Sequence, residues 1–117
     1  MFTQWYLCKA PLSCREEILE QITLTLCSNG LLIITNTNNE IHGNFTLNSD
    51  YINLNFDTCN KRVRHWRTFE ELHEANIADT FVDSLANKDL EYKLNGDTLI
   101  ILHEGQEYEF KICQYEI

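Results

Sequence analysis

The C-terminal third of the chain contains strand-like runs separated by turns of the kind that join antiparallel β-strands. An apolar run at residues 98–102 lies between Asn95-Gly96-Asp97 and His103-Glu104-Gly105, and residues 106–112 continue with alternating apolar side chains. Asn-Gly and Gly-containing pairs between such runs favour tight hairpin turns. This region therefore predicts a β-meander, which fixes an architecture and no chemistry.

The first half of the chain repeats the hairpin pattern. Residues 4–7 suggest a short opening strand, and residues 22–26 alternate strictly between apolar and polar side chains. The turn Ser28-Asn29-Gly30 leads into the apolar run 31–34, which predicts a hairpin. The polar residues 35–39 are rich in turn formers, so we expect a loop there.

A second hairpin is expected immediately afterwards. Residues 41–47 alternate, Asn48-Ser49-Asp50 forms a turn, and residues 51–56 alternate again. The segment 57–67 breaks the alternation and carries most of the local positive charge. It is a candidate binding loop.

Two segments have helical signals. Ser13 with Glu16 resembles a capping box before one or two turns that end at Leu19. Thr68 precedes apolar residues spaced three to five apart over 69–85, which predicts a helical segment of about 69–87 packed on the sheet. We expect this segment to break near Ala75-Asn76 and to end around residues 86–87.

Composition limits the class of protein. The 117 residues predict one domain over 1–117, large enough to bury a core. The net charge is −9, from 18 acidic residues and 9 Lys and Arg. This charge disfavours direct binding to nucleic acid or to anionic membranes and favours basic partners. Mimicry of nucleic acid would need clustered carboxylates, and only residues 16–20 and 70–74 provide short runs.

Cysteine and histidine positions predict neither a metal site nor a redox pair. The five cysteines include no Cys-x-x-Cys, and the four histidines are scattered singly. Thiols buried in a reducing compartment fit this pattern. Residues 1–12 do not resemble an export leader, and no run is long enough to span a membrane. The sequence as it stands predicts a cytoplasmic protein, or a periplasmic or lipoprotein-anchored one if an export signal was removed.

Several motifs along the whole chain together resemble a known family. They are Trp5-Tyr6-Leu7, the alternating run 22–26, Asn38 with Gly43-Asn44-Phe45-Thr46-Leu47, the run 52–56, Phe81 to Leu85, Tyr92 to Leu102, and 105–110. Their order is similar to that of the HslJ/META-domain family. The resemblance implies an α+β, mainly antiparallel β fold, a META-like meander or partly closed barrel with one helical segment on the sheet. A lipocalin-like half-barrel is the alternative.

The chain also departs from that family. The family's Cys-Asn pair appears here as Thr37-Asn38, and its later Thr-x-x-x-Cys corresponds at best to Thr58-Cys59. The family's disulfide is therefore not carried over to this chain. The export signal of most members is missing too, which leaves an envelope location open.

Two groups of polar residues are candidate sites. Glu70, Glu71, His73 and Glu74 lie within one or two helical turns. Glu70 with Glu74, or Glu70 with His73, would share a helix face and could hold a metal or act as acid and base, although a solvated surface is the simpler explanation. Asp57, Cys59 and His65 could form a thiolate–imidazolium pair, but no orienting third group is evident. Neither arrangement predicts catalysis.

Two binding hypotheses remain. The basic-aromatic patch could hold anions or planar groups, or its Trp could be core with the arginines paired to acids; it consists of Lys61, Arg62, Arg64, His65, Trp66 and Arg67. A small apolar ligand would instead need a pocket lined by Trp5, Phe45, Tyr51 and Phe56.

The sequence thus predicts a non-enzymatic domain without cofactor or metal. The leading hypothesis is an interaction module, stress- or envelope-related by resemblance, that binds a partner protein through its sheet face or the 57–67 loop. The alternatives are a lipocalin-like binder of a small apolar ligand and an acidic inhibitor that occupies a basic site on a nucleic-acid-binding protein.

Overall fold

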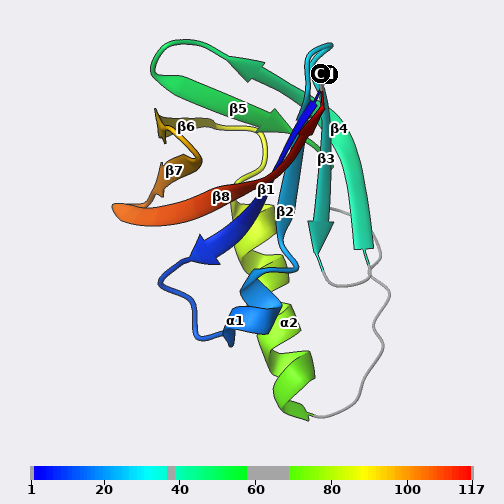
Figure 1. Ribbon diagram of the computed structural model, residues 1–117. Helices are drawn as coiled ribbons and strands as arrows, with labels where there is room; N and C mark the ends of the chain where they lie inside the picture. Colours follow the sequence, from blue (N-terminus) through cyan, green and yellow to red (C-terminus); the bar gives the residue numbers. More distant parts are fainter. Residues whose placement is uncertain (1, 37–38, 58–68, 117) are drawn as a thin grey trace.

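A computed structural model describes residues 2–36, 39–57 and 69–116 of the chain (Figure 1). The elements, in chain order, are β1 (Phe2–Lys9), α1 (Glu16–Leu19), β2 (Thr23–Cys27), β3 (Leu31–Asn36), β4 (Asn39–Leu47), β5 (Tyr51–Asn55), α2 (Phe69–Ser84), β6 (Asp89–Asn95), β7 (Thr98–His103) and β8 (Gln106–Glu116). The expected α+β class with mainly antiparallel strands is confirmed.

The strands form a closed antiparallel barrel in sequence order, β1 to β8. Closure occurs because β1 pairs with β2 on one side and with β8 on the other, with Leu7 opposite Phe110. The two ends of the described chain therefore lie side by side (Figure 1). Register shifts in β1 between Gln4 and Trp5 and between Leu7 and Lys9 bend this strand. Closure removes the open sheet edges that a half-barrel would expose.

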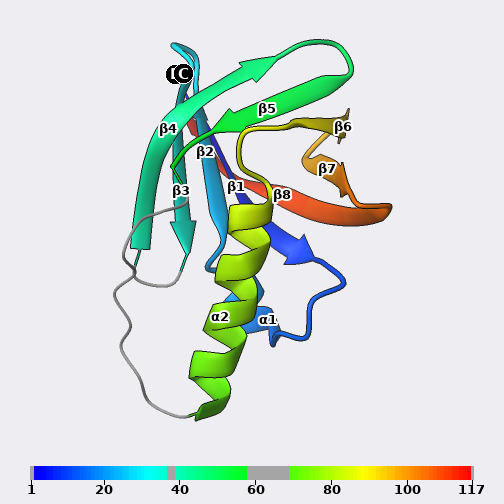
Figure 2. The ribbon, with the colours of Figure 1, turned by 180° about the vertical axis from the view of Figure 1, so that it is seen from behind.

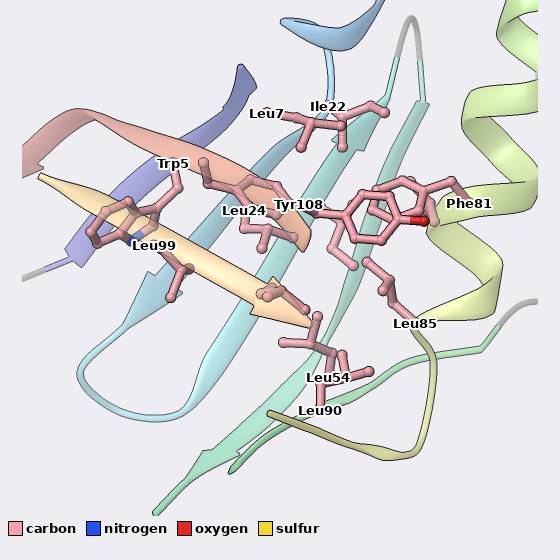
Figure 3. Packing of buried hydrophobic residues seen from close by; sticks show 14 of the residues in the cluster. Trp5, Leu7, Ile22, Leu24, Leu54, Phe81, Leu85, Leu90, Leu99 and Tyr108 are labelled. Carbon is pink, nitrogen blue, oxygen red and sulfur yellow. The ribbon is translucent and has the colours of Figure 1, made fainter. Parts of the chain in front are cut away.

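The barrel interior is packed with apolar side chains (Figure 3). In β7 the residues alternate between half-buried and buried, so that Leu99, Ile101 and His103 are the buried ones. In β5 the same alternation buries Ile52 and Leu54. In β5 the buried positions follow the period of two in the sequence, whereas the inward face of β7, a continuous apolar run, is seen only in the structure.

The helix α2 packs its apolar side against one end of the barrel (Figure 2). Ala78, Phe81, Val82 and Leu85 are buried there, and Leu85 follows the last helical residue, Ser84. Figure 3 shows Phe81 and Leu85 directed toward the side chains of the barrel strands. The packing of this face accounts for the spacing of three to four residues in the sequence.

The predicted break in this helix is wrong, because α2 runs without interruption from Phe69 to Ser84. Ala75 is buried and Asn76 is exposed. Alanine is the best helix former, and one asparagine on the solvent side costs at most about 0.7 kcal/mol. The favourable packing on either side outweighs that cost.

The predicted loop at residues 35–39 is also wrong at its ends. Thr35 and Asn36 continue β3, and Asn39 begins β4 opposite Asn36. Asn36 is fully buried and its amide donates to Asp79 of α2, so a turn-forming residue is recruited into a strand by a tertiary contact. Residues 37–38 lie outside the described part.

The capping box at Ser13 is not formed. The N-cap of α1 is Arg15, which has no side-chain capping bond of its own. The side chain of Glu74 in α2 instead accepts a hydrogen bond from the Arg15 backbone N–H. A long-range contact therefore replaces the local cap that the sequence suggested. The Thr68 cap lies outside the described residues.

Gly43 permits a close crossing of β4 and the end of β5. A Cβ at this position would lie 2.2 Å from the backbone oxygen of Asn55 and 2.9 Å from Cβ of Phe56. No other residue type fits such a backbone approach without movement.

Candidate functional site

A cleft of about 400 Å³ lies between α2, the segment after β1 and the β7–β8 hairpin. It opens to solvent at the end of the barrel that α2 covers. Its described lining residues are Leu12, His73, Asn76, Ile77, Thr80, Phe81, Ser84, His103, Glu104 and Tyr108. The lining thus combines apolar and aromatic groups with a few polar ones, as ligand sites commonly do.

The α2 wall of the cleft arises from helical periodicity. Residues 73, 76, 77, 80 and 84 recur at intervals of one, three or four and therefore share one side of the helix. His73, Asn76 and Thr80 are exposed, whereas Ile77 and Ser84 are half-buried. The hydroxyl groups of Thr80 and Ser84 donate to carbonyls of their own helix, at Asn76 and Phe81. These bonds fix both hydroxyls at the cleft wall.

His103 occupies the last inward position of β7, after Leu99 and Ile101. Only 6% of its surface is exposed. Among the described residues its Nε2 atom has no hydrogen-bond partner, and Glu104 Oε1, at 3.8 Å, lies beyond hydrogen-bonding distance. A buried polar atom without a partner is uncommon in folded proteins.

The turn after His103 sets the position of Glu104. Glu104 and Gly105 have φ values of 51° and 76°, which are typical of the two-residue turns that favour the twist of a β-hairpin. The carboxylate of Glu104 is 80% exposed at the rim of the cleft. The turn predicted at His103-Glu104-Gly105 is thus confirmed, and it carries one charged group of the site.

Tyr108 and Phe81 form the aromatic part of the lining. Their ring centroids are 4.4 Å apart and the rings are inclined by 23°, a stacked arrangement visible in Figure 3. Burial, followed by the charge of Glu104, raises the pKa of the Tyr108 hydroxyl above its usual value of 10.0. Tyr108 therefore presents a neutral hydroxyl at physiological pH.

Polar contacts hold α2 in the place where it forms the cleft. Glu74, itself buried, accepts from the Arg15 backbone and from Arg15 Nε at 2.8 Å. The Cys14 thiol donates to the Glu74 carbonyl at 3.4 Å. These bonds join the β1–β2 connection to α2, so that Leu12 can face the cleft.

The other end of α2 is fixed by Asn87. Its φ of 59° turns the chain, and its side-chain amide accepts from Phe56 N at 3.2 Å and donates to Phe56 O at 3.0 Å. The Asn87 backbone N–H donates to Leu54 O at 2.7 Å. The asparagine therefore pairs with the end of β5 as a short strand would.

The described residues that line the cleft include an acidic side chain but no lysine or arginine to balance it. Among its described lining residues are one carboxylate and two histidines, and no lysine or arginine. The Ser84 hydroxyl donates to a helix carbonyl, and no hydrogen bond joins it to an imidazole in the described part of the chain. The arrangement is suited to recognition through hydrogen bonds and apolar contact.

Of the described candidate residues from the sequence, only His73 is among those that line the cleft. The basic-aromatic patch, Lys61 to Arg67, falls outside the described residues, as do Cys59 and His65. Glu74 is bound to Arg15, and His73 faces the cleft. No group of three or more His, Cys, Asp or Glu among the described residues could hold a metal ion.

The four aromatic residues proposed to line an apolar pocket are not gathered around this cleft. Trp5 and Phe56 are buried, and Phe45 is half-buried opposite Leu54. Tyr51 is 40% exposed, because it points to the opposite side of β5 from its buried neighbour Ile52. None of the four is among the described residues that line the cleft.

Among the described cysteines, Cys8 and Cys14 lie in surroundings that lower thiol reactivity. Cys8, Cys14 and Cys27 are free and half-buried. Burial raises the pKa of Cys8 and of Cys14, with additional contributions from Glu109 and Glu74, respectively. A raised pKa lowers the thiolate population and hence the reactivity.

Sequence reasoning missed His103 and Tyr108 as site residues. No local signal singled out His103, because residues 98–102 form a continuous apolar run, and the alternation that buries positions 99, 101 and 103 is seen only in the structure. What the sequence lacked was the position of α2, which leaves this histidine beside a cleft.

Comparisons with known proteins give one fold likeness. No protein-family model and no curated protein matches the chain. The crystal structure of a DUF4847 family protein from Bacteroides vulgatus ATCC 8482 is similar, with a TM-score of 0.54 and 17% sequence identity. The match covers 81% of this chain and 61% of that protein, so this chain spans less than two thirds of its length. At this identity the likeness concerns the fold, and the META-domain resemblance stays a prediction.

None of the described helices has the length and apolar character needed to cross a membrane.

Proposed function

We propose that this protein is a non-catalytic binding domain whose ligand site is the cleft between α2 and the β7–β8 hairpin. The observation that carries the proposal is His103. Its Nε2 atom is buried at the cleft without a hydrogen-bond partner among the described residues. Leaving such an atom unpaired costs about 1–3 kcal/mol, which a ligand group at hydrogen-bonding distance recovers.

The dimensions and the lining of the cleft support this proposal. A volume of about 400 Å³ falls within the usual range for small-molecule sites. Ile77, Phe81 and Tyr108 supply apolar contact, and the hydroxyls and imidazoles supply orientation. The barrel interior, by contrast, is occupied by its own side chains. The ligand site thus differs from the interior pocket that a lipocalin-like binder would use.

The proposal leaves the protein-partner hypothesis open. A partner could present its own side chain to the cleft, and the 57–67 loop remains a predicted contact of that partner. The stress- or envelope-related role and the acidic-inhibitor alternative also stay predictions.

The test is a fragment screen by two-dimensional ¹H–¹⁵N NMR. We expect fragments with dissociation constants of about 1 mM to shift the amide signals of Ile77, His103 and Tyr108. The variant Thr80→Trp would fill the cleft from an exposed helix position and should abolish these shifts. The variant Glu70→Trp, also at an exposed position of α2 but not among the cleft lining, is the matched control.

Two results would contradict the proposal. One is a screen in which no fragment shifts the cleft signals. The other is binding that Thr80→Trp and Glu70→Trp affect equally.

A further inference from the structure

We propose that the group recognised in this cleft is a protonated amine carried on an apolar stem. This inference rests on the proposed function and specifies its ligand class. It follows from the spacing of two polar atoms, the charge around them and the apolar surface beside them.

The first step concerns the spacing. His103 Nε2 and Glu104 Oε1 are 3.8 Å apart. Nε2 itself has almost no accessible surface, so a ligand reaches it only when the cleft lining shifts slightly. One nitrogen placed about 2.9 Å from each atom then donates a hydrogen bond to both when Nε2 is the unprotonated ring nitrogen. An ammonium group carries three donors and no acceptor, so it satisfies both atoms at once.

The second step concerns charge. Glu104 contributes a carboxylate at the rim, and no lysine or arginine is among the described lining residues to balance it. The chain as a whole carries −9. An anionic ligand would be repelled, whereas a cation is attracted over distance and gains a charge-assisted hydrogen bond on arrival.

The third step concerns the stem. Leu12, Ile77 and Phe81 give the cleft an apolar surface, and the stacked ring of Tyr108 extends it. The raised pKa of Tyr108 keeps its hydroxyl neutral, so it adds no second negative charge. An ammonium on an apolar stem therefore matches both parts of the cleft. Such a group occurs in small free amines and in the lysine side chain of a partner protein.

The experiment compares three probes that share a phenyl stem and differ in the polar group: phenethylamine, phenethyl alcohol and phenylacetate. Affinities are measured by NMR titration at constant ionic strength. We expect the amine to bind most tightly, the alcohol about three- to fivefold more weakly, and the carboxylate most weakly of all.

Two charge variants of the same hairpin separate the local contact from general attraction. Glu104→Gln should weaken amine binding about three- to fivefold and leave the alcohol unchanged. Glu107→Gln removes the same charge from an exposed residue of β8 that is not among the cleft lining, and it should change neither affinity. His103→Phe should weaken the amine as well. Because Glu104 is exposed, its variant keeps the test valid even if the histidine variant fails to fold.

The source of the amine is tested with N-acetyl-lysine methylamide. Binding comparable to phenethylamine indicates a partner's lysine, whereas selective binding of phenethylamine indicates a free amine. Equal binding of the three phenyl probes, or equal effects of the two glutamate variants, would overturn the amine assignment while the cleft remained a binding site. If no probe and no screened fragment shifts the cleft signals, the proposed function fails as well.

Discussion

Replacement of Gly43 by alanine is expected to destabilise the barrel, although alanine is the better residue in most strands. The added Cβ would lie 2.2 Å from Asn55 O and 2.9 Å from Phe56 Cβ, while ordinary contacts begin at 3.4 Å. The nearest atom belongs to the backbone, so no side-chain rotation relieves the clash. The end of β5 must therefore move by about 1 Å, which is a case of overpacking.

Two effects of opposite sign determine the magnitude. Overpacking costs about 1–3 kcal/mol, and the backbone clash places this site at the upper end. The loss of glycine's freedom in the unfolded chain returns about 0.4–1 kcal/mol. We therefore expect a net loss of about 2 kcal/mol in the free energy of unfolding.

Urea denaturation followed by tryptophan fluorescence, to which the buried Trp5 contributes, would measure this loss. With a slope of about 2 kcal/mol per M, the midpoint should fall by about 1 M. Gly96→Ala is the control, because nothing lies within 4 Å of its Cβ. Its φ of +62° costs about 1–2 kcal/mol through backbone strain, from which the same return of about 0.4–1 kcal/mol is subtracted, so the net loss should be about 1 kcal/mol, half that of the Gly43 variant. The reasoning about Gly43 is refuted if its alanine variant unfolds at or above the wild-type midpoint.

Further predictions concern the polar anchors and the thiols. Glu74→Ala should lower the free energy of unfolding by about 2–3 kcal/mol, because it leaves the backbone N–H at the start of α1 without its acceptor. Glu74→Gln should lower it by about 1 kcal/mol, because the amide oxygen can still accept one hydrogen bond. Calorimetry or urea titration of the two variants measures the difference. Asn87→Ala loses two hydrogen bonds and keeps the positive φ, so it should lower the free energy of unfolding by about 2–3 kcal/mol. Asn87→Gly should lower it less, because glycine adopts a positive φ without strain. Equal losses in the two variants would exclude backbone strain as a factor. The raised pKa values of Cys8 and Cys14 favour the neutral thiol in the folded state. The stability that these two thiols contribute is therefore complete below their usual pKa of 9.0 and is lost as pH rises through the folded pKa. Iodoacetamide labelling of these two thiols, read by mass spectrometry at pH 8.5, should be slower in the folded protein than in urea, and equal rates would contradict the assigned burial.

The hairpins could be predicted because their signals are local. Ser28-Asn29-Gly30, Asn48-Ser49-Asp50 and the turn at Gly96 all join strands where the sequence indicated. The side chain of Asn48 accepts from the backbone N–H groups of Asp50 and Tyr51, which is the interaction that makes asparagine a turn residue.

Local signals misled where a distant residue supplied the partner. Asn36 reads as a turn residue, yet its contact with Asp79 draws it into β3. Ser13 reads as a helix cap, yet the N-cap is Arg15, whose backbone N–H donates to Glu74 of α2. In both cases a side chain more than 40 positions away satisfies the group that local chemistry was expected to satisfy.

The candidate site depended on the tertiary structure more than the strands and turns did. The apolar run 98–102 was enough to predict a strand, but only the structure shows that positions 99, 101 and 103 face inward. Whether that face met packed side chains or a cleft was decided by α2, which stacks Phe81 on Tyr108 and contributes Thr80 and Ser84 to the lining of the cleft that also includes His103.

The sequence by itself determined the antiparallel strands, their turns and, in the alternating strands, which side chains face inward, because these follow from residue alternation and from backbone preferences over a few positions. Only the tertiary structure decided that β1 pairs with β8 to close the barrel and that α2 covers one end beside a cleft. The physical reason is that closure and docking arise from contacts between residues far apart in the chain, whose favourable free energy depends on many side chains fitting together at once.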